Sequence, residues 1–341
     1  MLLERLSHAS GVSGNEGEVR EIIKEAVRDH VDELQVDNLG NLITLKKGKR
    51  PGPKVMIAAH MDEVGLMVTW IEKNGMLRFT TVGGIDKRVL QGKAVLVGPN
   101  RLPGVIGSKP IHRQEPSERN KPLPINQLFI DIGAKSKEDA EKKVKVGDYA
   151  IFATKFGEFG AGKYKGKAMD DRVGCLVLIE TLKNTYNMPV YGVFTTMEEI
   201  GTRGAAVAAH AVDPDLGIVL EGTVCADFMF DIPEGHATNI GAGPALSLMD
   251  ATSIANKAMV QHLVALAEKN KIPYQFRRAT SGGNDAGRIS LTRKGVPACS
   301  ISVPCRYIHS PVSVVSASDI ENTIKLLDTF LRSIEQGGLK L

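Results

Sequence analysis

The chain has 341 residues, of which 43% are apolar and 24% charged, and its formal net charge is +4. At roughly 150 residues per domain, this length predicts about two domains, and the composition excludes a disordered chain and a fibrous repeat. The nearly neutral charge balance gives no sign of a nucleic-acid partner, so we expect none.

The N-terminal segment has the pattern of a helix followed by strands. Residues 13–16 (SGNE) match a capping box, which predicts a helix start, and apolar residues then recur at helical spacing up to residue 31. Strands are predicted at 42–45 and 54–59. The basic Gly/Pro segment between them, 46–54, is predicted to be the solvated tip of a hairpin rather than a phosphate-binding patch.

From about residue 68 to residue 163 the pattern changes. Short strands predicted at 77–80, 94–97 and 128–131 alternate with Gly and Pro, and one short helix is predicted at 136–144. Short strands with regular turn signals favour a small β-barrel or sandwich. Residues 112–127, which carry Pro116, Pro122 and Pro124 among charged residues, are predicted to be a mobile loop.

After residue 166 strands and helices alternate. Strands are predicted at 190–195, 216–220, 274–278 and 298–303, and helices at 172–182, 204–210, 253–269, 285–291 and 318–334. This alternation predicts a mostly parallel sheet covered by helices on both faces. The N-terminal segment shares the pattern, so we expect one discontinuous α/β domain, 1–67 and 164–341, with residues 68–163 inserted as a β domain.

The cysteines and the apolar runs predict the compartment. Cys175, Cys225, Cys299 and Cys305 form no C-x-x-C pair, and four cysteines in a chain this long do not make a disulfide framework. We expect buried, reduced thiols in a cytoplasmic protein. The first five residues lack an apolar core and no apolar run approaches the roughly 18 residues that span a bilayer, so we expect neither a signal peptide nor a membrane partner.

His60 ends the apolar run 55–59, and Asp62 follows at i+2, on the same side of an extended chain. A carboxylate that holds the second ring nitrogen of a ligating histidine is common around metals. Taken alone, the pair is weak evidence, and it is more typical of a surface histidine. Asp170 and Asp171 open a predicted helix, where adjacent carboxylates can simply act as caps.

Three further residues follow strand-like runs. Glu198 and Glu199 come after the strand 190–195, where a solvated loop is the alternative, and Glu221 ends the run 217–220. His309 follows the run 301–308, although a lone histidine beside an apolar stretch is more often structural. Open α/β sheets place their sites at the carboxyl ends of parallel strands, so we expect these side chains to meet at one edge.

The chemistry of this set points to a metal-dependent hydrolase. Two histidines with several carboxylates, and no cysteine, suit one or two borderline divalent ions such as Zn, Co or Mn. A carboxylate that is not needed as a ligand would serve as general base.

The sequence resembles the glutamyl/deblocking aminopeptidase family, the tetrahedral cytosolic dinuclear metallo-aminopeptidases, some of whose members carry the name cellulase M. The likeness extends from about residue 2 to residue 335. It rests on the segments 11–16 (GVSGNE), 59–65 (AHMDEVG), 166–172 (GKAMDDR), 196–201 (TMEEIG), 282–287 (GGNDAG) and 306–311 (RYIHSP).

The resemblance implies two divalent ions per subunit, zinc or cobalt. Asp170 corresponds to the carboxylate that bridges them. His60 and Glu221 correspond to the remaining ligands of one ion, and Glu199 and His309 to those of the other. Many members have Asp where this chain has Glu221, so the longer side chain is expected to alter metal spacing or preference.

Two catalytic roles are also implied. Glu198 corresponds to the general base that takes a proton from the water activated by the two ions, and Asp62 to the partner of His60. The family often has a cis peptide after the bridging aspartate, here between Asp170 and Asp171. Substrate binding is expected at Gly282, Gly283 and Asp285, with a plain tight turn and a helix cap at Asp285 as the alternative.

The implied fold is a phosphorylase/hydrolase-like α/β peptidase domain with a mixed sheet and an inserted β-barrel or PDZ-like domain for dimerisation and access. Family members form hollow tetrahedral dodecamers built from dimers, which would restrict substrates to peptides. The resemblance thus implies release of N-terminal amino acids.

Two other functions compete. An endoglucanase would use Glu198 and Glu199 as its carboxyl pair, but it would leave both histidines without a role, and 5% aromatic residues offer few surfaces for sugar stacking. A non-catalytic metal-binding scaffold would not need Glu198, a carboxylate without a ligand role.

Overall fold

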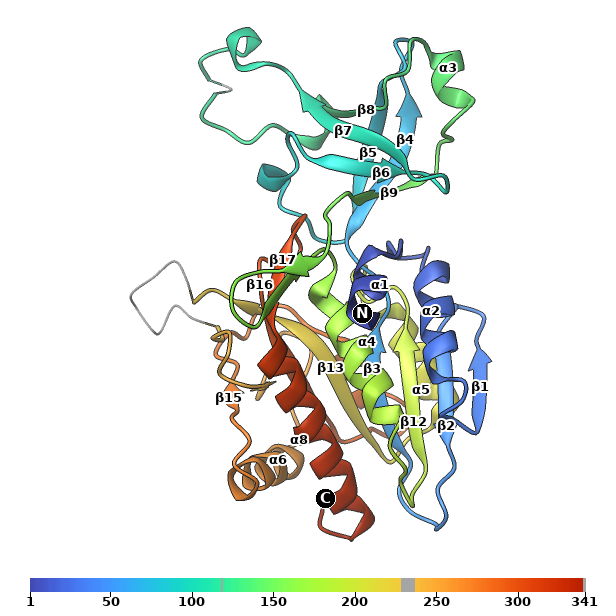
Figure 1. The fold of residues 1–341 in the computed structure, drawn as a ribbon, viewed down its shortest axis with the longest axis vertical. Helices are drawn as coiled ribbons and strands as arrows, with labels where there is room; N and C mark the ends of the chain where they lie inside the picture. The colour runs from blue at the N-terminus through green and yellow to red at the C-terminus, as the bar shows by residue number, and fades with distance from the viewer. Residues whose placement is uncertain (118, 228–236, 340–341) are drawn as a thin grey trace.

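The computed structural model describes residues 1–117, 119–227 and 237–339. An eleven-stranded mixed sheet forms the centre of the larger, lower part of the molecule (Figure 1). Its main path runs β1 (Glu33–Val36), β2 (Leu42–Lys46), β12 (Val190–Thr195), β3 (Val55–His60), β13 (Leu216–Cys225), β16 (Ala298–Arg306), β17 (Ser313–Ser316), β11 (Lys163–Gly166) and β10 (Gly157–Glu158). The short strands β14 (Ala245–Leu246) and β15 (Gln275–Phe276) pair beside β16.

The expectation of a mostly parallel sheet is wrong. Parallel pairing is confined to the four central strands β12, β3, β13 and β16 and to the short pair β14–β15, and the other described pairs are antiparallel. In the register of the four central strands Thr195 lies opposite His60 at the carboxyl ends of β12 and β3, whereas Glu221 lies opposite Ser302 inside β13 and β16, which continue to Cys225 and Arg306. The hairpin expected around residues 46–54 is wrong, because β12 pairs with both β2 and β3 and separates them. A local turn signal cannot reveal a strand that arrives from far along the chain.

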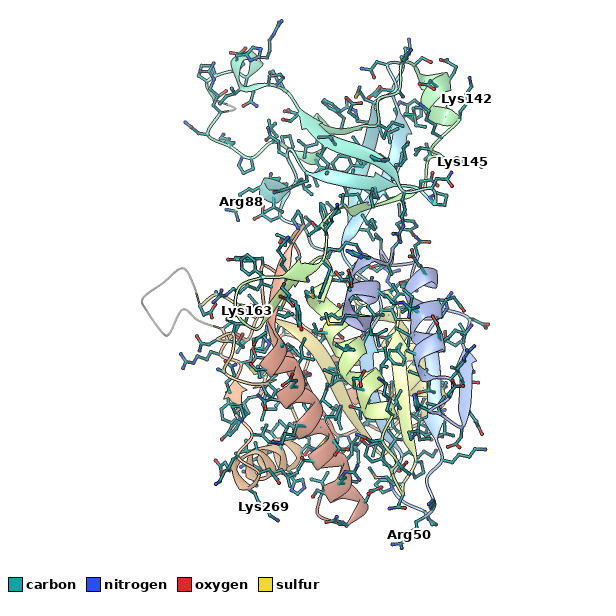
Figure 2. The ribbon with its side chains drawn as sticks, viewed as in Figure 1. Arg50, Arg88, Lys142, Lys145, Lys163 and Lys269 are labelled. Atoms are coloured by element: carbon teal, nitrogen blue, oxygen red, sulfur yellow. The ribbon has the colours of Figure 1, made fainter. Side chains whose placement is uncertain are left out.

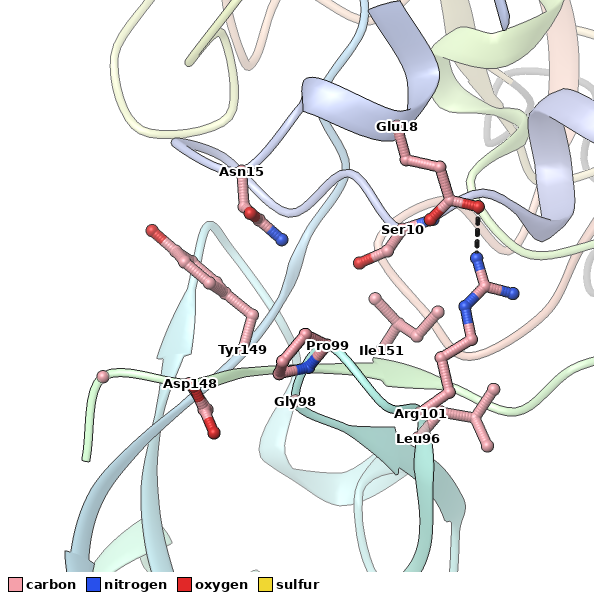
Figure 3. A pocket seen from close by; sticks show the side chains of 11 residues that line it. Ser10, Asn15, Glu18, Leu96, Gly98, Pro99, Arg101, Asp148, Tyr149 and Ile151 are labelled. Atoms are coloured by element: carbon pink, nitrogen blue, oxygen red, sulfur yellow. Dashed lines mark hydrogen bonds and ion pairs between the residues drawn. The ribbon is translucent and has the colours of Figure 1, made fainter. Parts of the chain in front are cut away.

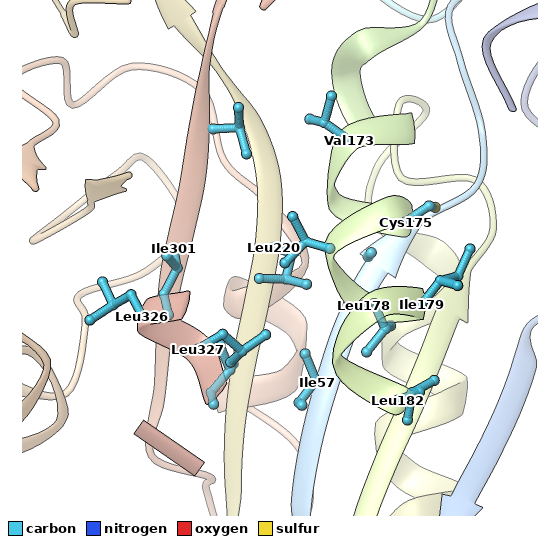
Figure 4. Packing of buried hydrophobic residues seen from close by; sticks show 14 of the residues in the cluster. Ile57, Val173, Cys175, Leu178, Ile179, Leu182, Leu220, Ile301, Leu326 and Leu327 are labelled. Atoms are coloured by element: carbon cyan, nitrogen blue, oxygen red, sulfur yellow. The ribbon is translucent and has the colours of Figure 1, made fainter. Parts of the chain in front are cut away.

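Helices cover both faces of this sheet, as predicted. One face carries α1 (Leu2–His8), α2 (Gly17–Val27), α4 (Met169–Leu182), α6 (Lys257–Lys269) and α8 (Ala317–Glu335), and the other carries α5 (Arg203–Val212) and α7 (Asp285–Ser290). Successive side chains of β3 point to opposite faces of the sheet, so the strand contributes to the apolar core on each face. Ile57 packs with the first group of helices, and Met56 and Ala58 pack with the second. Figure 4 shows Ile57 beside Leu178 of α4 and Leu220 of β13.

The segment between β3 and β11 forms a closed six-stranded barrel, as the short strands predicted. Its strands are β4 (Gly65–Ile71), β5 (Leu77–Val82), β6 (Ala94–Val97), β7 (Leu102–Ser108), β8 (Leu128–Asp131) and β9 (Tyr149–Phe152). The barrel has its own apolar core and lies above the sheet in Figure 1. The chain enters it just after His60 and leaves it before Asp170, so the insertion separates residues that meet in the fold.

Several local expectations need correction. The helix expected at 136–144 is shorter, α3 (Lys137–Glu141), and residues 112–127 contain parts of two 3-10 turns, η2 (Ile111–Arg113) and η3 (Ile125–Gln127); a third, η1 (Lys87–Val89), precedes β6. The capping box at 13–16 is wrong: α2 begins at Gly17 without a side-chain cap, and the Ser13 hydroxyl bonds elsewhere.

The cysteine thiols and the basic side chains are placed as the sequence led us to expect. All four cysteines are buried and free. In Figure 2 the labelled basic residues Arg50, Arg88, Lys142, Lys145, Lys163 and Lys269 are spread over both parts of the molecule rather than gathered in one patch. Within the described ranges, no helix is both long and apolar enough to cross a membrane.

Candidate active site

The predicted ligands meet around one carboxylate at the carboxyl edge of the sheet. Asp170 lies at the start of α4. Its two oxygens face different histidines: Oδ1 lies 3.3 Å from His60 Nε2, and Oδ2 lies 3.6 Å from His309 Nε2. His60 comes from the end of β3, and His309 from the turn between β16 and β17. One carboxylate therefore connects two histidines that are far apart in sequence.

Each histidine has a second carboxylate beside it. Glu221 Oε2, from β13, lies 3.6 Å from His60 Nε2, and Glu199 Oε2, from the turn after β12, lies 3.1 Å from His309 Nε2. The arrangement is two histidine–glutamate pairs that share Asp170. Ligand atoms of His60, Asp170 and Glu199 all lie within 4.8 Å of one another, a spacing that a metal ion could occupy.

Burial and the negative charge of neighbouring carboxylates make it unfavourable for all the acidic groups of this cluster to be ionised at once. Burial raises the pKa of Glu221 to about 8, and burial together with the charge of Glu221 raises the pKa of Glu198 well above its usual range. Burial also opposes ionisation of Asp170, yet the neighbouring imidazoles of His309 and His60 hold its pKa below the usual range. Buried carboxylates that repel each other in this way are relieved by a bound cation.

Unpaired polar atoms at the centre of the cluster fit divalent metal ions. Within the described part of the chain, Asp170 Oδ1 and Glu221 Oε1 are buried and have no hydrogen-bond partner. Leaving such atoms unpaired costs free energy unless a ligand satisfies them. Imidazole and carboxylate donors are those that zinc and cobalt accept.

Asp62 lies behind His60, as the sequence pattern predicted. Its Oδ1 is 3.3 Å from His60 Nδ1, although the alignment falls short of a hydrogen bond. The same carboxylate accepts hydrogen bonds from the backbone N–H groups of Glu198 and Glu199, at 3.0 and 3.1 Å. Asp62 therefore contacts both His60 and the backbone of the turn that carries the two glutamates.

Asp171, for which the sequence suggested only a helix cap, also contacts the site. Its carboxylate accepts hydrogen bonds from the backbone N–H groups of His60 and Gly174, at 3.2 and 2.9 Å. It also lies near His60 and Glu221 at a spacing that suits a metal ion, but both of its oxygens already accept hydrogen bonds from backbone N–H groups. The peptide bond between Asp170 and Asp171 is cis, as the family resemblance implied.

The backbone beside the ligands adopts an uncommon conformation. Ala168, Met197 and His309 have φ values of +56°, +54° and +56°, in the left-handed region that residues other than glycine rarely occupy. Such conformations persist where the surroundings enforce them, and they concentrate at functional sites. No sequence signal marked these three positions, because none of them is a glycine.

A cavity of about 130 Å³ adjoins the cluster. The residues that line it include Asp170, Glu198, Glu221 and His309, and also Gly282 and Gly283. Asp285 is not among the lining residues: it is buried, it accepts a 2.6 Å hydrogen bond from Thr195 Oγ1, and the side chain that caps α7 is Asn284.

Comparisons with known proteins agree with one another. A family model described as M42 glutamyl aminopeptidase matches residues 40–326. A putative aminopeptidase of Acetivibrio thermocellus is 43% identical over 336 residues, 96% of each chain. The structure of an aminopeptidase from the archaeon Desulfurococcus kamchatkensis has a TM-score of 0.94 at 36% identity, covering 100% of this chain and 97% of that one. The TET1 peptidase of Pyrococcus horikoshii, which can assemble into a tetrahedron or a large octahedral shell, has a TM-score of 0.86 at 33% identity, covering 96% and 98%.

Proposed function

The chain belongs to the M42 glutamyl aminopeptidase family and is an aminopeptidase, and from this premise we propose that it removes N-terminal amino acids from peptides with the help of two divalent metal ions. The single observation that carries the proposal is the position of Asp170, whose two oxygens face His60 and His309 separately. A carboxylate placed in this way suits a bridge between two ions.

The proposed ligands divide into two sets that share Asp170. His60 and Glu221 would complete the set for one ion, and His309 and Glu199 would complete the other. Zinc or cobalt fits this donor set, which contains imidazole and carboxylate and no thiolate. When bound, such ions lower the pKa of water and polarise a scissile carbonyl.

Glu198 is proposed as the general base. It lines the cavity beside the ligands, whereas its neighbour Glu199 pairs with His309. From there its carboxylate can take a proton from the attacking water and deliver it to the leaving amine. Asp62 supports this role, because it holds the backbone N–H of Glu198 while facing His60.

The cavity beside the cluster is proposed to hold the N-terminal residue of the substrate. Gly282 and Gly283 form part of its wall, and an added Cβ at Gly283 would collide with the Thr252 side chain. Asp285 lies behind this wall, so we propose that it acts on substrate only by supporting the loop.

Self-association is proposed by analogy. The TET1 peptidase of Pyrococcus horikoshii can assemble into a tetrahedron or a large octahedral shell, and a tetrahedral assembly here would be a dodecamer built from dimers. The inserted domain predicted at residues 68–163, which contains most of the barrel, would provide dimer contacts and control access. We further propose a cytoplasmic enzyme, in which the buried thiols stay reduced.

Metal-dependent release of an N-terminal residue is the decisive measurement. The protein is assayed with aminoacyl anilides and with carboxymethylcellulose, first as isolated, then after chelation, and then after addition of zinc or cobalt. We expect anilide hydrolysis that disappears on chelation and returns with metal. Cellulose cleavage without anilide hydrolysis would favour the endoglucanase alternative, and metal binding without either activity would favour a scaffold.

A further inference from the structure

We propose that Ser13 is a positioning residue of the active site, which acts on the reaction through Asp62. The proposal rests on the function proposed above, because Asp62 matters only if His60 and Glu198 have the roles assigned to them. It replaces the helix-capping role that the pattern at residues 13–16 predicted.

The Ser13 hydroxyl bonds into the site rather than to a helix end. Ser13 Oγ donates a 2.6 Å hydrogen bond to Asp62 Oδ2, and both side chains are buried, with 3% and 0% of their surface exposed. The other hydrogen bonds that this carboxylate accepts come from the backbone N–H groups of Glu198 and Glu199. A hydrogen bond to an ionised acceptor is among the stronger ones, and burial increases its effect.

The rest of the same loop bonds to the segments that carry the site. The backbone of Ser13 donates to Glu63 O, and the backbone of Glu63 donates to Gly11 O, so the loop pairs with the chain just past Asp62. Glu16, which is 4% exposed, accepts hydrogen bonds from the backbone N–H groups of Gly14 and Met197. The loop therefore holds both the Asp62 segment and the turn that carries Glu198.

The outer side of this loop faces the inserted barrel. Figure 3 shows the pocket between them, where Ser10 and Asn15 lie across from Tyr149, and Glu18 pairs with Arg101. The loop is thus confined on one side by the barrel and on the other by the site. Its inner surface offers Asp62 one hydroxyl, which fixes the carboxylate in the orientation that faces His60 Nδ1.

The consequence for catalysis follows from this geometry. Without the Ser13 hydroxyl, Asp62 Oδ2 keeps only the backbone N–H of Glu199, so the carboxylate is held less firmly in the orientation that faces His60. Carboxylates that orient a metal-ligating histidine typically change metal affinity or activity by about 10- to 100-fold when they are removed. Loss of Ser13 should produce the lower part of that range and should leave substrate binding unchanged.

Ser13→Ala tests the proposal, with Thr323→Val as the control. Thr323→Val removes another fully buried hydroxyl, whose 2.7 Å hydrogen bond goes to a helix carbonyl on α8. We expect Ser13→Ala to lower kcat about tenfold with KM within twofold, and to weaken binding of Co²⁺ to the apoprotein, followed by its visible absorption, by a similar factor. Thr323→Val should change neither quantity.

A double-mutant cycle with Asp62→Asn separates positioning from general stability. If Ser13 acts through Asp62, adding Ser13→Ala to Asp62→Asn should cost little more than Asp62→Asn alone. Additive losses, wild-type kcat and Co²⁺ affinity in Ser13→Ala, or a loss that merely follows the fraction of unfolded protein would each overturn the proposal. An inactive wild-type enzyme would contradict the proposed function, while the Co²⁺ titration would still test Ser13.

Discussion

The ammonium group of Lys167 lies 2.7 Å from a carboxylate oxygen of Glu63, and the two side chains are only 2% and 3% exposed. Arg172, which is fully buried, reaches the same carboxylate at 3.1 Å. Glu63 follows Asp62 directly, and Lys167 and Arg172 flank Asp170 in sequence. This buried cluster therefore ties together the two chain segments that the inserted barrel separates.

Removing the carboxylate of this cluster should destabilise the protein strongly. Glu63→Gln leaves Lys167 and Arg172 buried without their shared counter-charge, and breaking a buried pair in this way costs about 3–5 kcal/mol. Denaturant unfolding of wild type and variant measures the difference. Glu25→Gln, which breaks the exposed pair with Arg5, is the matched control and should leave the midpoint nearly unchanged. Equal effects of the two changes would contradict the prediction.

Lys167 should also make stability depend on pH. Burial lowers the pKa of Lys167 from its ordinary value of 10.5 to about 8. Between these values the unfolded chain binds more protons than the folded protein, so the contribution of Lys167 to the free energy of unfolding rises with pH, by about 3 kcal/mol at most. Unfolding of wild type and Lys167→Met at pH 8, 9 and 10 should show a difference that shifts in favour of wild type. A constant or opposite difference would refute this assignment.

Glu198 and Glu199 are adjacent, but substituting them should have different effects on activity and on metal content. Glu198→Gln should lower kcat by about 10²- to 10⁴-fold, because it removes the proposed base, while the metal content stays at the wild-type value. Glu199→Gln should lower metal content, because it removes a proposed ligand that pairs with His309. Metal analysis beside anilide hydrolysis distinguishes the two. Metal loss in Glu198→Gln would show that the two roles are interchanged.

Glu221 offers a test of the unusual ligand. Glu221→Asp shortens the side chain beside His60 but keeps a carboxylate, so hydrolysis should survive within roughly tenfold of wild type, and the order of preference among zinc, cobalt and manganese should change. Glu221→Gln keeps the length but weakens the donor, and it should lose one ion. Equal behaviour of both variants would argue against Glu221 as a ligand.

The predicted elements succeeded where the physical signal is local. The strands at 94–97, 128–131 and 190–195 agree with β6, β8 and β12, because apolar runs between turn residues indicate strands directly. The start of α6 at Lys257 rather than at residue 253 was missed, as was the strand β1 at Glu33–Val36, which lies at the sheet edge and is largely exposed. Edge strands lack the apolar alternation that the prediction depends on.

By itself, the sequence determined the fold class, the family and the position of His60, Asp170, Glu199 and His309 at strand ends or a helix start. Glu221, predicted to end its strand, lies inside β13 instead. Those features depend on residue type and spacing along the chain. Tertiary structure alone decided which atoms meet: that the two oxygens of Asp170 face different histidines, that β12 separates β2 from β3, and that Ser13 bonds to Asp62 instead of capping a helix. These contacts join residues far apart along the chain, 139 positions in the case of His309 and Asp170, and spacing along a chain carries no information about such distances.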